Sequence, residues 1–117
     1  MSHSSTLQSF IAGRWIGQNG AQVLRSAIDG HDIARTHEER PDFAEAIEHG
    51  RRQGVSGLMA LDFQQRAQRL KALALYLSER KEQLYAISHH SGATRADSWI
   101  DIEGGNSTLF TYASLGS

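Results

Sequence analysis

The strongest hydrophobic pattern in the chain lies over residues 62–91. Apolar side chains recur there at steps of three, four and seven, which places them on one face of a helix. Asp62 can act as the N-cap, Gln65 stands where a capping box needs it, and Gly92 suits the helix end. A polar run near Arg80 could interrupt the helix. We expect its apolar face to be buried against another element. That face comprises Ala67, Leu70, Leu73, Ala74, Leu77, Leu84 and Ile87.

Shorter apolar runs occupy the first part of the chain. They flank two turn-like clusters at 17–20 and 29–32, and the first contains Asn-Gly, a pair favoured in primed turns. This pattern predicts a small antiparallel β-hairpin or meander over 7–36, preceded by a loose N-terminus over 1–6. Because so few strands are marginal alone, they must lie on something else.

Two further helices are expected, one on each side of the long one. Asp42 can cap a helix over 42–54, and residues 54–57 are interpreted as a linker because they contain two glycines. Thr94 can cap a helix over 94–116. The fold class is therefore α+β and mostly helical, with a hairpin or meander followed by about three helices.

Composition excludes several classes of function. The 117 residues carry a net charge of −1 without a basic block, which argues against nucleic acid and anionic membranes as partners. The absence of cysteine excludes disulfides, thiolate metal sites and a cysteine nucleophile within these residues. No apolar run approaches the ~20 residues of a membrane helix, and no secretory signal opens the chain. We expect a cytoplasmic protein.

The six histidines do not form a recognisable metal motif. His89 and His90 are adjacent, so on a helix they point about 100° apart and cannot easily share an ion. The others lack a spacing such as H-E-x-x-H, and surface or loop positions explain them better. We expect no metal site.

A glycine-rich patch formed by Gly13, Gly17 and Gly20 invites a phosphate-binding hypothesis. A phosphate loop would need G-x-G-x-x-G or a Walker pattern followed by a helix, and neither is present. Hairpin turns explain these glycines equally well, so no cofactor-binding residue is assigned.

Acidic and aromatic side chains offer two further hypotheses. Paired carboxylates at Asp97 and Asp101, with Glu103 nearby, could perform acid–base work, although capping and solvation are the simpler explanation. Aromatic side chains could stack a ligand, but packing is commoner. No catalytic residue is assigned from these patterns. The aromatic candidates are Trp15, Trp99, Phe110 and Tyr112.

Gly104 and Gly105 stand in the interior of the last expected helix. Each costs ~1 kcal/mol relative to alanine there. We therefore expect either that something approaches the helix backbone closely at this point or that the helix bends.

The segment over 92–117, GATRADSWIDIEGGNSTLFTYASLGS, resembles the early region of the bifunctional phenylacetate-degradation family. In that family an aldehyde dehydrogenase is fused to a hot-dog-type, enoyl-CoA hydratase-like domain that opens an oxepin-CoA ring. Three segments resemble parts of the aldehyde dehydrogenase superfamily: residues 10–15 its opening strand, 28–30 the turn of its second strand, and 66–84 its R-x-x-x-L-x-x-x-A-x-x-L helix. The resemblance spans 7–117.

This resemblance implies the N-terminal segment of an aldehyde dehydrogenase, covering one side of its dinucleotide-binding domain. The family oxidises a CoA-linked semialdehyde with NADP. Its catalytic cysteine, glutamate base and cofactor-binding crossover come later in the chain, so this chain alone should be inactive. Gly104 and Gly105 would border the substrate channel.

The expected partners are the remainder of the polypeptide and further copies in a homo-oligomer. The alternatives are a stand-alone helical oligomerisation or interaction module without catalysis, and a truncated product without function.

Overall fold

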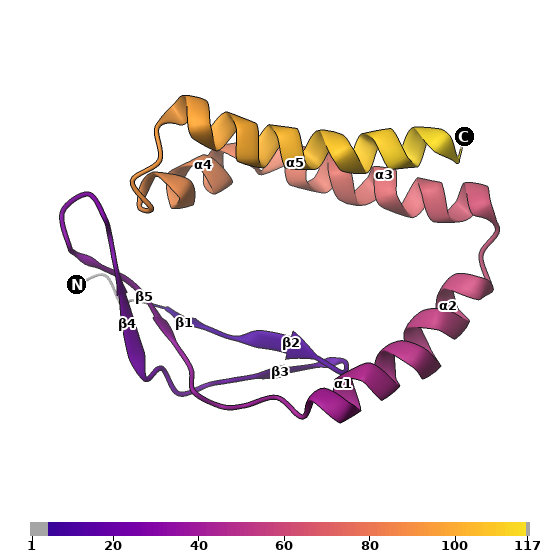
Figure 1. The fold of residues 1–117 in the computed structure, drawn as a ribbon, viewed down its shortest axis with the longest axis horizontal. Helices are drawn as coiled ribbons and strands as arrows, with labels where there is room; N and C mark the ends of the chain where they lie inside the picture. Colours follow the sequence, from indigo (N-terminus) through magenta and orange to yellow (C-terminus); the bar gives the residue numbers. More distant parts are fainter. Residues whose placement is uncertain (1–4, 117) are drawn as a thin grey trace. The chain divides into compact units, whose positions relative to one another are not determined.

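The computed structural model describes residues 5–116. These residues fall into two compact units that divide between Gly57 and Leu58. The first unit contains short strands followed by a helical run, and the second contains helices packed side by side (Figure 1). The chain is α+β and mostly helical, as expected. Its described residues form four helical segments rather than about three, because the long central helix is divided.

The strands of the first unit form two small sheets. One sheet has the order β1-β5-β4, with β1 parallel and β4 antiparallel to β5, and the other is the antiparallel pair β2-β3. The parallel pair was not foreseen, since only a hairpin or meander was expected. The strands are β1 Thr6–Leu7, β2 Ser9–Ile11, β3 Arg14–Ile16, β4 Gln22–Arg25 and β5 Asp32–Thr36.

The start of the described chain is tied to β5. The amide of Arg35 donates to the carbonyl of Ser5 at 3.0 Å, and Thr6 pairs with Arg35 across the parallel ladder. A loose N-terminus is therefore wrong for these two residues, because the ladder satisfies their backbone groups. Residues 1–4 lie outside the described part of the chain.

The first hairpin turn lies at Ala12-Gly13 and not at Asn19-Gly20. Ile11 pairs with Arg14, which leaves a two-residue loop whose φ angles are 51° and 79°. Two positive φ angles are the mark of a type I′ turn, whose twist matches that of the strands. Asn19-Gly20 instead joins β3 to β4, which belong to different sheets. A primed turn was therefore expected at the wrong position.

A continuous helical run follows the sheets. It consists of α1 Phe43–His49, the π-helical turn η1 Gly50–Gly54 and α2 Val55–Met59. The linker expected at 54–57 is absent, because the wider π-turn carries the backbone through both glycines in helical conformation. Asp42 caps α1 by accepting from the amide of Glu45 at 3.0 Å. The Glu45 carboxylate does not complete a capping box, since Arg14 holds it at 2.9 and 3.0 Å.

The second unit begins with the helix expected over 62–91, which is divided at Arg80. Asp62 and Gln65 form the reciprocal capping box at 2.7 and 2.9 Å that starts α3 Phe63–Glu79. Arg80 leaves the helical region at φ −110° and ψ 12°, and its guanidinium lies 3.5 Å from the Tyr76 ring centroid. After this break, α4 spans Lys81–His89. Gly92 then reverses the chain at φ 87°.

The last helix, α5 Arg95–Leu115, packs along α3 and α4 (Figure 1). Its N-cap Thr94 accepts from the amide of Asp97 at 3.2 Å. Small buried residues line the contact, so the helices approach closely. A Cβ added to Gly116 would lie 2.4 Å from the Ala67 side chain, for example. The buried residues of this unit are Ala67, Ala74, Tyr85, Ser98 and Ala113.

The expected apolar face of 62–91 is only partly buried. Ala74 is completely buried, whereas Leu73 and Ile87 remain 47% and 68% exposed. The alanines of the face are therefore buried in the helix contact, Leu77 and Leu84 are half-buried beside it, and Leu73 and Ile87 remain exposed.

Candidate functional site

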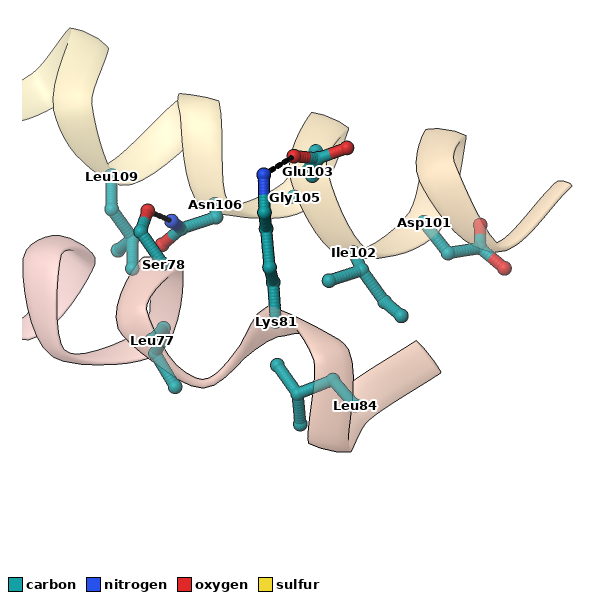
Figure 2. Close-up of a pocket in the computed structure, with 10 residues that line it drawn as sticks. All are labelled: Leu77, Ser78, Lys81, Leu84, Asp101, Ile102, Glu103, Gly105, Asn106 and Leu109. Carbon is teal, nitrogen blue, oxygen red and sulfur yellow. Dashed lines mark hydrogen bonds and ion pairs between the residues drawn. The ribbon is translucent and has the colours of Figure 1, made fainter. Parts of the chain in front are cut away.

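A groove of about 430 Å³ lies between α3–α4 and α5 in the second unit (Figure 2). It forms beside the break at Arg80, where α4 continues from α3 in a new direction. The apolar part of its lining is half-buried, while charged side chains stand at its edge. The lining residues are Leu77, Ser78, Lys81, Leu84, Asp101, Ile102, Glu103, Gly105, Asn106 and Leu109.

Glu103 is the charged centre of this region. Its Oε1 accepts from Lys81 Nζ at 3.2 Å, and its Oε2 accepts from the Tyr85 hydroxyl at 2.7 Å. These two donors, the Tyr85 hydroxyl first, lower the pKa of Glu103 below its usual value. Burial and the neighbouring carboxylate raise the pKa of Tyr85. Glu103 is therefore held ionised and doubly bonded, which suits a structural role better than proton transfer at neutral pH.

Asp97 and Asp101 do not form a carboxylate pair with Glu103. Asp97 is occupied at the helix N-terminus, where its Oδ2 accepts from the Thr94 hydroxyl at 2.9 Å. Asp101 stands at the edge of the groove. The structure thus favours capping and ion pairing over the acid–base hypothesis.

Asn106 fixes α5 to α3. Its Nδ2 donates to the Ser78 hydroxyl at 2.7 Å (Figure 2). The same Nδ2 donates to the backbone carbonyl of Ala74 at 3.0 Å. Because the Ala74 carbonyl can only accept, the side-chain oxygen must point elsewhere. That Oδ1 is buried and has no hydrogen-bond partner among the described residues.

Gly104 and Gly105 differ in position. Gly105 lines the groove, and Gly104 does not. A Cβ added to either would meet no heavy atom within 4 Å, so no described part of this chain approaches the backbone there. The two costly glycines therefore leave open space beside α5.

A second set of contacts joins α4 to the start of α5, and the sequence patterns did not reveal it. The guanidinium of Arg95 lies 4.2 Å from the Tyr85 ring centroid and 3.2 Å from the Glu82 carboxylate. The Ser88 and Ser98 hydroxyls are 2.7 Å apart, and Ser98 is only 2% exposed. Hydroxyls at such spacing carry no recognisable motif, which is why they were missed.

The histidines are dispersed over the two units. The rings of His89 and His90 pack edge-on with centroids 5.8 Å apart, and His37 Nε2 lies 3.0 Å from the Ser9 hydroxyl. Within residues 5–116, no three His, Cys, Asp or Glu side chains gather in a way that could hold a metal ion.

The glycine-rich patch does not fit a dinucleotide. Gly13 forms the hairpin turn, and the Gly17 amide already donates to the Glu39 carboxylate at 2.7 Å. Glu38 and Glu39 both line the adjacent hollow, where they would repel a pyrophosphate.

The candidate aromatic residues do not converge on one ligand. Trp15 packs against Phe10 with ring centroids 5.1 Å apart, and both rings are exposed. Trp99 and Tyr112 are exposed on α5, separated along the helix by about 20 Å at 1.5 Å per residue.

Comparison with known proteins gives one informative similarity, and no family model matches the chain. A 3,4-dehydroadipyl-CoA semialdehyde dehydrogenase from Aromatoleum evansii is 32% identical over 112 residues. The alignment covers 94% of this chain but only 22% of that protein. The similarity supports a relationship to an aldehyde dehydrogenase. The chain spans about a fifth of the length of this curated relative.

A search of the described helices for one long and apolar enough to cross a membrane finds none.

Proposed function

We propose that this chain is the N-terminal part of an NADP-dependent aldehyde dehydrogenase that oxidises a CoA-linked semialdehyde during aromatic degradation in the cytoplasm. The observation that carries the proposal is the 32% identity to the A. evansii dehydrogenase along 94% of the chain. The chain would cover one side of the dinucleotide-binding domain in a homo-oligomer. A ring-opening domain fused to the same polypeptide would supply the aldehyde in the phenylacetate pathway.

The chain should have no dehydrogenase activity by itself. It contains no cysteine, so it lacks a thiolate that could attack an aldehyde. Its most perturbed carboxylates, Glu45 and Glu103, have lowered pKa values because Arg14 and Tyr85 bind them. Such carboxylates are poor general bases at neutral pH. Its role is therefore structural.

A chimera tests this proposal. Residues 5–116 would replace the matched region of the A. evansii dehydrogenase, and oxidation of 3,4-dehydroadipyl-CoA semialdehyde would be followed by NADPH absorbance. We expect activity within about tenfold of the parent enzyme. A chimera that folds, shown by a parent-like circular dichroism spectrum and melting transition, but does not oxidise the semialdehyde would overturn the proposal. Turnover by the isolated chain would contradict its structural role.

We further propose that Gly104 and Gly105 border the channel for the CoA-linked substrate. The support is the open space beside both glycines, at a position where each costs ~1 kcal/mol of helix stability. In the active chimera, Gly104→Leu should raise the KM for the semialdehyde several-fold with little change in kcat. Gly104→Ala, which restores helix propensity with a minimal side chain, serves as the control. An unchanged KM in the leucine variant would remove the channel assignment.

The alternative of a stand-alone oligomerisation module is favoured by a different observation. Large apolar side chains stand more than half exposed on the helices, among them Phe43, Met59 and Ile87. Such surfaces can be buried by self-association. Sedimentation analysis of the purified chain distinguishes the two: a discrete, concentration-stable oligomer supports the module, and an inactive chimera would reinforce it.

A further inference from the structure

The groove between α3–α4 and α5 has the composition of a docking site. Leu77, Leu84, Ile102 and Leu109 present half-buried apolar surface to it, and the Lys81–Glu103 ion pair stands at its edge (Figure 2). An apolar floor with a polar rim is the usual anatomy of a protein interface.

The groove region also lacks one hydrogen-bond donor. Asn106 Oδ1 is buried without a partner among the described residues, although its amide nitrogen is fully used on Ala74 and Ser78. Buried side-chain acceptors in folded proteins are almost always paired. Because neighbouring atoms of the chain cover this oxygen, the unmade hydrogen bond belongs to the α3–α5 contact beneath the groove, and an occupant would be recognised by its apolar side chains.

Gly105 lines the groove on the α5 side and adds no side chain to it. A Cβ there would meet nothing within 4 Å, so no packing inside this chain requires glycine. Alanine would stabilise the helix, since glycine costs ~1 kcal/mol more in a helix interior. A small residue at this point is explained if another segment passes close to it and forms the facing wall of the substrate channel proposed above.

We propose that this groove docks an apolar segment from the part of a dehydrogenase polypeptide that has no counterpart in this chain. The inference rests on the proposed function and names the surface on which the two parts meet. The aligned relative supplies an occupant, because nearly four-fifths of its length lies outside the match. The docked segment inserts apolar side chains above Leu77 and Leu109.

Cysteine footprinting provides the first test, because the chain has no cysteine of its own. Gly105→Cys is introduced into the isolated 117-residue chain and into the chimera with the A. evansii dehydrogenase. Both are labelled with iodoacetamide, and labelling at position 105 is quantified by peptide mass. We expect the cysteine at position 105 to react with iodoacetamide as fast as an exposed thiol in the isolated chain, and at least tenfold more slowly in the chimera. Equal rates would mean that the groove stays open and would overturn the proposal.

Gly104→Cys is the matched control. It is the adjacent glycine, equally open in this chain, but it does not line the groove. It should keep most of its reactivity in the chimera. Equal protection at both positions would show that α5 is enclosed on all sides, and a specific docking groove would then be rejected.

A substitution with opposite effects in the two proteins provides the second test. Gly105→Leu should raise the Tm of the isolated chain by about 3–6 °C, because leucine is the better helix former. In the chimera the same side chain should lower the Tm, because it occupies space that the docked segment needs. A higher Tm in both proteins would refute docking.

These outcomes separate this inference from the proposed function. A folded, inactive chimera with protected position 105 rejects the dehydrogenase role and keeps the docking surface. An active chimera with a reactive position 105 keeps the dehydrogenase role and rejects the docking surface. A chimera that does not fold counts against both proposals. If the isolated chain is instead a dimer that Gly105→Leu dissociates, a second copy occupies the groove and the proposal is wrong.

Discussion

Replacing Asn106 by leucine should have little effect on the stability of the isolated chain, although two hydrogen bonds are lost. The Asn106 amide donates to the Ala74 carbonyl and to the Ser78 hydroxyl. After the substitution, the Ala74 carbonyl keeps its bond within α3, and the serine hydroxyl can turn to a backbone carbonyl one turn earlier. Neither partner is left without a hydrogen bond.

The magnitude follows from three opposing contributions. Losing two hydrogen bonds costs about 2 kcal/mol at about 1 kcal/mol each. Removing a buried, unpaired acceptor such as Asn106 Oδ1 returns about 1–3 kcal/mol of desolvation free energy. Leucine also adds apolar surface beside Leu77 and Leu109 at the groove. The free energy of unfolding should therefore change by no more than about 1 kcal/mol.

Urea unfolding followed by circular dichroism at 222 nm measures this change, with Asn106→Asp as the contrasting variant. Aspartate has a similar shape but would place a carboxylate against the Ala74 carbonyl, so it should lose about 3 kcal/mol at pH 7. If leucine were as damaging as aspartate, the side-chain oxygen would have to be satisfied and the reasoning would fail.

The other predictions concern the turns, the caps and the charged cluster. Gly17→Ala should lower the free energy of unfolding of the first unit by about 2 kcal/mol or more, because φ is +86° there and a Cβ would lie 2.1 Å from the His37 ring. NMR signals of residues in this unit, followed through a urea titration, measure the change. Asp62→Ala should lower the urea midpoint by the equivalent of about 1 kcal/mol through loss of the capping box. The pKa of Glu103 is lowered from 4.5, so its ionised form stabilises the fold above pH 4.5, and this stabilisation is lost as the pH falls through the lowered pKa. The pKa of Tyr85 is raised from 10.0, so its protonated hydroxyl stabilises the fold below pH 10, and this stabilisation is lost as the pH rises through the raised pKa. The melting temperature should fall at acid and at alkaline pH. Glu103→Gln should reduce the fall at acid pH, and Tyr85→Phe should reduce the fall at alkaline pH.

Features that depend on near neighbours in sequence were predictable. The capping box at Asp62 and Gln65, the cap at Thr94 and the left-handed Gly92 each involve residues within one helical turn. Their hydrogen bonds are specified by local spacing, so a pattern three residues apart identifies them without knowledge of the fold.

Features that depend on competing partners were not predictable. Glu45 stands at the capping-box position, but the guanidinium of Arg14 from a distant strand binds it more strongly. Asn19-Gly20 has the better turn sequence, yet the strand register places the turn at Ala12-Gly13. In each case, contacts across the unit outweigh a local preference.

The candidate groove is the clearest example of this difference. Apolar periodicity identified Leu77 and Leu84 as members of a helix face, but it could not show which members touch α5. The helices meet through Ala67, Ala74 and Ala113, because small side chains allow the backbones to approach. The leucines beside this close contact stay half-buried and line the groove together with Ile102 and Leu109 of α5. A groove of this kind follows directly from mixing alanine and leucine on one helix face, because the small residues set the distance between the helices and the large ones border the space beside the contact.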